Sequence, residues 1–527
     1  MTVPFKNRWL IEGMVTLSSP LELRTGLAAE RAVKGASGEE EDRTAEVALV
    51  QRDCDNQPCI LGSSLKGVLR AWLAERLPNE KASIENVFGR KPQAWKKDPA
   101  KQAGLGGKAE FLDAFLADLS FVVGEFSAVP LPQLGRAAIE RPTRTAAHER
   151  LFHGEQVPTA TAFKVKVAGD SLTPHEVVLL LAALEGFNAK DDDLPITLGG
   201  GGARGTGRAD WQLVSVRCMD VAAVARWLGE AKPRPWHEAI GDDPRTARDR
   251  AKLADQARAL LAGATRPAWL ALDLKLAFSG PFLVNDPTRL KEKEEGKNHP
   301  DFEPTRDHNG RPLLPGSSVK GALRAQAERI FRTVHGEQAL PKPDDNGDGR
   351  PRNEIEWLFG VGGWRGMLTV SDFSEVSPPA NAKDGFAEQE FVAIDRFTGG
   401  AAEGAKFKAR VAEAPVMEGR LSLRLTRPRE TVSHYHARWA LGLMALVLRD
   451  LVEGDITFGY GAAKGFGACT VTIKGPFGSP AARLCEALPG LPLPTLAPAA
   501  SRDAARKLYG QAIGAALTSF RAPWEDL

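Results

Sequence analysis

A short basic motif occurs twice in the sequence, each time where a strand pattern gives way to a helix pattern. Residues 60–71 read ILGSSLKGVLRA and residues 314–325 read LPGSSVKGALRA, so eight of twelve positions are identical at a separation of 254 residues. The first amides of a helix lack partners inside the helix and carry partial positive charge. Small residues let a phosphate approach those amides, and a lysine and an arginine on nearly the same face add full charges. The motif therefore predicts two phosphate sites, with Ser63, Ser64, Lys66 and Arg70 in one and Ser317, Ser318, Lys320 and Arg324 in the other.

A serine that only caps a helix would produce part of the same motif. The repetition of the lysine and the arginine favours phosphate binding over capping alone. The residue order differs from the Gly-x4-Gly-Lys-Ser/Thr order of a Walker A loop. The motif therefore indicates a nucleic acid as the ligand.

Further landmarks recur in the same order, which is typical of an internal duplication. Glycine-dense loops near the end of each copy bring backbone amides against a ligand, and Arg204 and Lys464 supply charge there. The recurring landmarks are Phe88-Gly89 with Phe359-Gly360, Asp113 with Asp372, Ile139-Glu140-Arg141 with Ile394-Asp395-Arg396, and Gly205-Thr206-Gly207 with Gly465-Phe466-Gly467, at offsets of 271, 259, 255 and 260.

The hydrophobic periodicity predicts the same elements in both copies. A strand opens each copy, near residues 9–23 and 269–278, and the basic motif then begins an amphipathic helix. Two strand patterns, a long apolar helix, the glycine-dense loop and a last strand follow. This βαββαβ order predicts an α+β fold with two tandem ferredoxin-like (RRM-like) domains, whose helices cover one face of an antiparallel sheet. The expected divisions are a first domain (1–217), a helical connector (218–266), a second domain (267–476) and a C-terminal helical appendage (477–527).

The composition is that of a globular protein. Of the 527 residues, 43% are hydrophobic and 26% are charged, and no apolar run approaches the ~20 residues that cross a bilayer. No signal peptide is expected, and five scattered cysteines indicate a reducing cytoplasm rather than a disulfide scaffold. The net charge of +2 argues against a sequence-blind DNA coat but allows local basic clusters.

The order of these motifs resembles the RAMP superfamily, and specifically the backbone subunits of type III CRISPR effector complexes. The resemblance covers residues 3–216 and 268–473, although Leu61 stands in the first copy where proline is usual. It implies a subunit that binds crRNA, with Arg141 and Arg396 in thumb hairpins that interrupt the guide–target duplex. Two fused copies resemble the tandem fusions of type III-D systems. The residues that carry the resemblance are LRTGL at 23–27, LPGSSVKG at 314–321, the two Ile-[Glu/Asp]-Arg triplets and the glycine-dense loops.

The resemblance also implies where target RNA would be cut. In this family an aspartate in a D-x-P-x-x-[KR]-D loop, ahead of the basic motif, cuts the target opposite the thumb. The second copy reads DFEPTRD at 301–307, with the proline displaced by one position. The resemblance therefore implies Asp301 as the catalytic residue, with Asp286 as the runner-up. Val47 takes the matching place in the first copy, so the second copy is expected to cleave and the first mainly to hold RNA.

A single carboxylate suits this chemistry, because RNA carries its own nucleophile, the 2′-hydroxyl. The protein has to align that hydroxyl with the phosphorus and to relieve charge. Asp301 can position a divalent metal, Mg²⁺ or Mn²⁺, or help to remove the hydroxyl proton. The sequence leaves open whether Glu46 or Asp42 gives the first copy an activity of its own.

Three other functions remain open. The same scaffold without catalysis would be a structural subunit. A guide-processing endoribonuclease of the same superfamily would act without metal and often through histidine, but His148 and His153 are expected at the surface. The third is an adaptor whose glycine loops only pack. The leading hypothesis is a cytoplasmic, metal-dependent endoribonuclease that binds crRNA, complementary target RNA and other CRISPR effector subunits, and no membrane.

Overall fold

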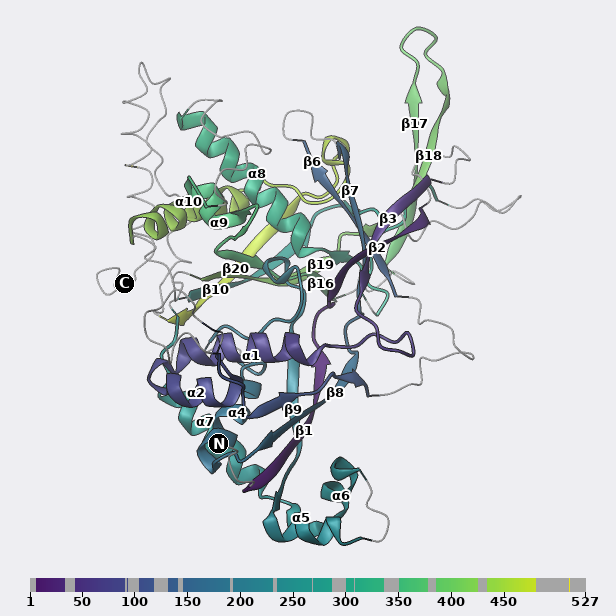
Figure 1. The fold of residues 1–527 in the computed structure, drawn as a ribbon. Coiled ribbons are helices and arrows are strands. Elements are labelled where there is room, and N and C mark those ends of the chain that lie inside the picture. The colour runs from purple at the N-terminus through teal and green to yellow at the C-terminus, as the bar shows by residue number, and fades with distance from the viewer. Residues whose placement is uncertain are drawn as a thin grey trace.

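Two modules of the same architecture follow each other along the chain (Figure 1). Each module has its own hydrophobic core, as independently folding units do. The computed structural model describes residues 6–33, 43–90, 92, 104–117, 131–140, 146–189, 193–230, 235–267, 269–286, 300–307, 309–335, 350–377, 385–424, 434–479 and 511.

The first module is built on an antiparallel sheet. Its elements are β1 (Asn7–Leu17), α1 (Gly62–Arg76), η1 (Pro78–Glu80), α2 (Lys81–Phe88), β4 (Ala109–Phe111), β5 (Phe115–Leu116), β8 (Ala162–Asp170), α4 (Pro174–Glu185), η2 (Gly202–Arg204) and β9 (Ala209–Asp220). The strand order is β4-β8-β1-β9, with β5 also paired to β8. Leu65 and Leu69 of α1 are fully buried in one cluster with Leu184 of α4, because their helical spacing turns one face of α1 towards the sheet.

The second module repeats this plan. Its elements are β10 (Trp269–Phe278), β12 (Leu313–Leu314), α8 (Gly316–His335), α9 (Glu354–Phe359), β13 (Gly360–Val361), β14 (Trp364–Arg365), β15 (Leu368–Val370), β16 (Phe373–Ser377), β19 (Val416–Arg424), α10 (His434–Val452), η6 (Ala462–Lys464) and β20 (Cys469–Ser479). The strand order is β12-β16-β19-β10-β20, with β15 paired to β19. Val319 and Leu323 of α8 are fully buried in its core, at the positions that Leu65 and Leu69 hold in α1.

Both central sheets place the first and third strands of the βαββαβ unit in the middle. The matching orders are β9-β1-β8-β4 and β20-β10-β19-β16, and all these pairs are antiparallel. This is the ferredoxin-like arrangement, present in tandem. The predicted α+β fold class is confirmed.

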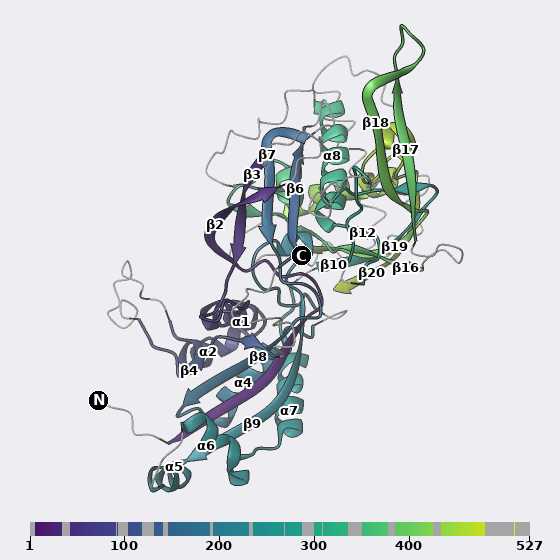
Figure 2. The same cartoon turned by 90° about the vertical axis from the view of Figure 1, so that its right-hand side faces the viewer.

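Each module also carries an inserted sheet. In the first it has the order β2-β3-β7-β6, with β3 and β7 parallel, and in the second the order β11-β18-β17. The β17–β18 hairpin projects from the body, and the β6–β7 hairpin lies beside the second module (Figures 1 and 2). The strands are β2 (Arg24–Val33), β3 (Arg43–Val50), β6 (Gln133–Ile139), β7 (Ala146–Glu155), β11 (Pro281–Phe282), β17 (Phe386–Ile394) and β18 (Ala401–Glu413).

Helices follow β9 in the segment expected to be a connector: α5 (Val221–Leu228), α6 (Trp236–Asp242), η3 (Pro244–Thr246) and α7 (Arg250–Ala262). They pack on the first module. Ala257 of α7 joins its core, while α5 and α6 cover Leu10 and Met219 on the opposite face of the sheet. Helices therefore cover both faces of this sheet and not one face, because apolar residues alternate onto the outer face as well.

The predicted C-terminal appendage lies outside the described residues, apart from residues 477–479 and 511. Among the described residues, every helix is too short or too polar to cross a membrane.

Candidate functional site

The two Gly-Ser-Ser turns open α1 and α8, and an aspartate distant in sequence closes each turn. The amide of Gly62 donates to Asp113 Oδ1, and the amide of Gly316 donates to Asp372 Oδ1, both at 2.7 Å. A carboxylate at a helix start accepts a hydrogen bond from an otherwise unpaired amide, and its negative charge interacts favourably with the positive end of the helix dipole. The recurrence of this aspartate in the sequence therefore reflects a shared helix cap.

The glycine of each turn is required by packing. A Cβ on Gly62 would lie 1.9 Å from the carbonyl oxygen of Phe111, and one on Gly316 would lie 2.5 Å from that of Val370. Protein backbone thus occupies the space that the sequence analysis left for a phosphate beside the glycine. The serines remain open: Ser63 is exposed, and Ser64, Ser317 and Ser318 are half-buried without a hydrogen-bond partner for their hydroxyls among the described residues.

The glycine-dense loop of the first module docks on the Gly-Ser-Ser turn of the second. Gly205 has a φ of +85°, and a Cβ there would lie 2.6 Å from Ser371 Cα. Lys320 spans the same contact, since its Nζ donates to the carbonyl oxygen of Leu368 at 2.7 Å and to that of Ala203 at 3.5 Å. A loop interpreted from the sequence as a ligand cradle therefore also joins the modules.

Lys320 and its counterpart Lys66 lie in different surroundings. Burial lowers the pKa of Lys320 to about 7, and the positive charges of Arg365, Arg204 and Arg324 act in the same direction. Because its amine binds protein carbonyls inside the junction, the placement favours a structural role for Lys320. Lys66 is half-buried and forms no hydrogen bond with another described residue.

The two arginines of the motif differ in the same way. Arg324 donates to Glu328 Oε1 at 2.8 Å and to the carbonyl oxygen of Gly360 at 3.3 Å. Arg70 is half-buried without a partner among the described residues. The motif of the first module thus keeps more of its donors available than that of the second.

Next to the junction, three arginines surround one buried carboxylate. Glu22 is 1% exposed and accepts hydrogen bonds from Arg136 and Gln156, while Arg24 and Arg204 approach it to 3.1 and 3.6 Å. Burial alone would raise the pKa of Glu22, but the hydrogen bond and charge of Arg136, with Gln156 and Arg204, outweigh it and leave the pKa below its usual value. The excess of guanidinium groups over carboxylate suits a phosphate. Arg204 was predicted for this site, and Arg24 and Arg136 were not.

Asp301 lies beside the middle of β18, on the side of that strand away from β17. Its amide donates to the carbonyl oxygen of Lys408 at 2.7 Å, and its Oδ2 accepts from the Lys408 amide at 2.8 Å. The side chain is half-buried, and its Oδ1 has no hydrogen-bond partner among the described residues. One carboxylate oxygen therefore holds the loop, and the other is available for a metal ion or a proton.

The remaining predicted residues of the second module lie apart in the hairpin and its base. Asp286 is 8% exposed, and its amide donates to the carbonyl oxygen of Glu303 at 2.8 Å. Asp286 is thus more deeply buried than Asp301. Arg396 is exposed in the turn between β17 and β18. Arg141, its counterpart, lies outside the described residues.

Val47 and Asp301 occupy the same register position. Ala48 pairs in parallel with Gly154 of β7, and Phe302 pairs in parallel with Ala409 of β18, at offsets of 254 and 255. Ala48 is the residue after Val47, and Phe302 is the residue after Asp301. The strand register therefore agrees with the comparison of the two copies, which matched Val47 with the candidate catalytic residue Asp301.

The surroundings of Val47 are closed. Val47 is fully buried beside His153, which is 5% exposed, and neither ring nitrogen of His153 has a hydrogen-bond partner among the described residues. The expectation that His153 lies at the surface is therefore wrong, and its burial lowers the pKa of the imidazole. The side chain of His148 lies outside the described residues. Glu46 is exposed and, by strand alternation, faces away from Val47. Asp42 lies outside the described residues.

A lysine–aromatic cluster connects the glycine-dense loop of the second module with the hairpin and the Asp301 loop. Lys464 Nζ lies 4.8, 4.4 and 5.0 Å from the ring centres of Phe391, Phe407 and Tyr460. Phe302, the neighbour of Asp301, stacks on Tyr460 at 5.3 Å and meets Phe407 edge-on at 5.5 Å. Lys464 was predicted as a functional residue, but its aromatic partners were not: isolated phenylalanines in strands are more often core residues, and Tyr460 was not singled out within the glycine-dense loop.

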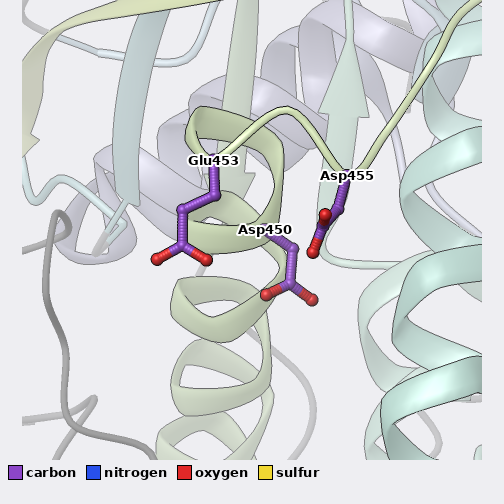
Figure 3. A group of neighbouring side chains, drawn as sticks. All are labelled: Asp450, Glu453 and Asp455. Carbon is purple, nitrogen blue, oxygen red and sulfur yellow. The ribbon is translucent and has the colours of Figure 1, made fainter.

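A separate acidic group lies at the C-terminal end of α10. Asp450, Glu453 and Asp455 come from its last turn and the following loop (Figure 3), with ligand atoms within 4.8 Å of one another. Asp450 Oδ2 accepts from Gln326 at 2.6 Å and its Oδ1 accepts from Arg449, so this carboxylate is already paired. The group includes none of the carboxylates predicted for cleavage.

A search of curated proteins finds no match. The family model described as RAMP superfamily matches residues 15–210 and 236–470, one stretch for each module and together well over half of the chain. Each stretch contains a Gly-Ser-Ser turn and a glycine-dense loop. The chain therefore belongs to the RAMP superfamily of CRISPR-associated RNA-binding proteins and carries the domain of that family twice.

Proposed function

We propose that this protein is a crRNA-binding backbone subunit of a type III CRISPR ribonucleoprotein, with the tandem organisation of type III-D fusions, and that its second module cleaves complementary target RNA. The observation that carries the proposal is an asymmetry at one register position of two matching modules. The second module has Asp301 there, with one carboxylate oxygen unengaged among the described residues. The first module has the buried Val47.

Guide binding is supported by the positive charge beside the junction. Among the described residues, the ion pairs of Arg24, Arg136 and Arg204 all go to the carboxylate of Glu22, so three guanidinium groups share one paired carboxylate. Phosphate contacts from arginine position an RNA strand without reading its sequence. A subunit that has to bind guides of any sequence requires such contacts. Ser63, Lys66 and the other open groups of the first turn are further donors for RNA phosphates.

A place in a row of RAMP modules is supported by the junction itself. Gly205 meets the backbone of the following module, whereas its counterpart Gly465 has a φ of +82°, and none of the described residues lies within 4 Å of its Cβ direction. At the other end, no loop of the described part of the chain docks on Lys66 as one docks on Lys320. We infer that another RAMP module docks at each end, through the same two surfaces that meet inside the chain.

In the cleavage step, Asp301 takes the proton of the target 2′-hydroxyl. The 2′-oxygen bonds to the phosphorus while the bond from phosphorus to the 5′-oxygen breaks, and that oxygen takes a proton from water. The products are a 2′,3′-cyclic phosphate and a 5′-hydroxyl. The β17–β18 hairpin would interrupt the duplex and leave the nucleotide beside Asp301 free to align for attack.

A divalent metal, Mg²⁺ or Mn²⁺, fits this site in one respect. Mg²⁺ is often held by one or two carboxylates together with substrate phosphates, and Asp301 Oδ1 is unengaged among the described residues. Bound there, the ion would act as a Lewis acid on the phosphate oxygens, and the 2′-hydroxyl proton would then pass to water instead of to Asp301.

The test is Asp301→Asn in the complex assembled with guide RNA. Asparagine keeps an oxygen that can accept from the Lys408 amide, so the loop should stay in place. We expect target binding to remain and target cleavage by this subunit to be lost. Cleavage at every position with the variant would show that this chain is not the nuclease.

One observation favours a second candidate, a purely structural crRNA-binding subunit. Asp301 Oδ2 is committed to the Lys408 amide, which a structural role alone would explain. The same variant separates the two functions, because a structural subunit would leave all cuts in place. Full cleavage in the presence of a chelator would instead favour a metal-independent endoribonuclease that processes guides.

A further inference from the structure

We propose that Lys464 is a phosphate-neutralising residue of the Asp301 cleavage centre, held in position by an aromatic box of Phe391, Phe407 and Tyr460. The inference rests on the proposed function and assigns a second residue to its reaction. It assigns to the glycine-dense loop of the second module a part in cleavage beyond guide binding.

The box places the ammonium group by several weak contacts at once. Phe391 and Phe407 face each other across the hairpin and stack at 4.8 Å, and Lys464 Nζ lies 4.4 Å from the centre of the Phe407 ring. The Tyr460 hydroxyl accepts a hydrogen bond from Nζ at 3.1 Å. Cation–π contacts hold an ammonium group without neutralising its charge, and an ammonium group has three donors. Donors therefore remain for phosphate oxygens.

The box is adjacent to Asp301 through Phe302. Phe302 follows Asp301 in the chain and contacts both Tyr460 and Phe407. Lys464 is exposed, and it forms no ion pair with a carboxylate among the described residues. An exposed positive charge thus lies across the Tyr460 and Phe407 rings from Phe302, in the chain segment that carries the proposed cleavage residue.

The first module has a different arrangement at the same place. Arg136 and Phe152 are paired across the β6–β7 hairpin, at the positions of Phe391 and Phe407, an offset of 255 for both. There Arg136 binds the carboxylate of Glu22, and Arg204, the counterpart of Lys464, lies 3.6 Å from the same group. The module without the aspartate therefore ties its cation to a carboxylate, and the module with the aspartate holds it on aromatic rings.

This difference matters for the chemistry. As the 2′-oxygen attacks, negative charge accumulates on the phosphate oxygens, and a positioned cation stabilises that charge more than it stabilises the bound target. A lysine already paired with a carboxylate would gain less. The aromatic box keeps the side chain ordered while its charge stays available to the phosphate.

The experiment compares Lys464→Met, Lys464→Arg and Lys252→Met in the complex with guide RNA. Lys252 is exposed on α7, which lies at the other end of the molecule from the β17–β18 hairpin (Figures 1 and 2), and serves as the matched loss of one charge. With target RNA saturating, we expect Lys464→Met to slow cleavage by about tenfold or more. Target affinity should stay within about threefold, since one phosphate contact among several is lost. Lys464→Arg should keep most of the wild-type cleavage rate, and Lys252→Met should cleave as the wild type does.

Two results would overturn the assignment. One is wild-type cleavage by Lys464→Met under saturating target in a preparation where Asp301→Asn is inactive. The other is a loss confined to target affinity, with bound target cut at the normal rate, which would make Lys464 a binding residue only. Tyr460→Phe keeps the ring and removes the hydrogen-bond acceptor, so a smaller loss than that of Lys464→Met is expected. Cleavage that survives Asp301→Asn would contradict the proposed function itself, whatever Lys464 does.

Discussion

Val47 of β3 and His153 of β7 are paired side by side in the first module, and both are buried. In the second module the corresponding pair is Asp301 and Lys408, with Asp301 half-buried. A buried apolar side chain next to a histidine cannot meet an RNA strand without local opening. The difference between the modules is therefore one of access as well as of residue type.

Restoring the carboxylate alone should not restore a second cleavage site. Val47→Asp would place a carboxylate in a fully buried position, and we expect it to lower the free energy of unfolding by roughly 3 kcal/mol. Thermal unfolding measures the loss, and mapping the cuts on a target RNA checks the activity. Val47→Ala is the control, because it removes packing without adding a charge. A new cut opposite the first hairpin would contradict this prediction.

His153 should make the first module sensitive to mild acid. Its folded pKa lies below the usual 6.5, so the unfolded chain binds more protons than the folded chain as the pH falls below about 6.5. Stability is therefore full above that pH and declines as the pH falls towards the folded pKa. We expect His153→Leu to unfold at a higher temperature than the wild type at pH 5.5, with a smaller difference at pH 7.5. An unchanged acid dependence in the variant would contradict this role of His153.

The fold could be predicted from the sequence because each motif and each hydrophobic pattern occurs twice, once in each copy. The Gly-Ser-Ser turns, the helix faces of Leu65 and Val319, and the strand order all recur at nearly constant offsets. The recurring Asp113 and Asp372 were found as landmarks, but their role as helix caps was not. A cap that comes from another strand leaves no local pattern beside the helix that it closes.

The site was predicted less completely, for two physical reasons. Lys66 and Lys320 are equivalent in sequence, but only Lys320 is covered by the loop of the preceding module, and sequence spacing does not show which loop docks on which turn. Phe391 and Phe407 come from the two hairpin strands, far in sequence from Lys464, so no local motif connects them with it; only Tyr460 lies in the same loop. Asp301 was placed by family resemblance, since a lone aspartate in a loop carries little signal of its own.

Lys320 should make the stability of the module junction depend on alkaline pH. Its folded pKa is about 7 against 10.5 for a free lysine, so between these values the unfolded chain binds more protons and stability rises with pH. We expect the wild type to gain stability from pH 7 to pH 9 relative to Lys320→Met, measured by urea denaturation at both values. Lys66→Met is the control and should keep the wild-type slope. Equal slopes for Lys320→Met and the wild type would contradict the burial of a lysine that titrates in this range.

Gly205 and Gly465 offer a matched test of the docking surface. Both have left-handed backbones, with φ of +85° and +82°, so alanine strains each by a similar amount, about 1 kcal/mol. Only Gly205 faces the following module, where a Cβ would lie 2.6 Å from Ser371 Cα. We therefore expect Gly205→Ala to lower the unfolding temperature of the isolated chain more than Gly465→Ala does.

When complexes assemble, Gly465→Ala should have the larger effect of the two substitutions. If Gly465 meets the Gly-Ser-Ser turn of a neighbouring module as Gly205 meets Ser371, then Gly465→Ala adds a clash that the isolated chain does not contain. Assembly with guide RNA, followed by sedimentation, should then give shorter particles for Gly465→Ala than for the wild type. Particles of normal length would mean that the open loop of the second module docks on no further turn, and that the internal junction has no counterpart between chains.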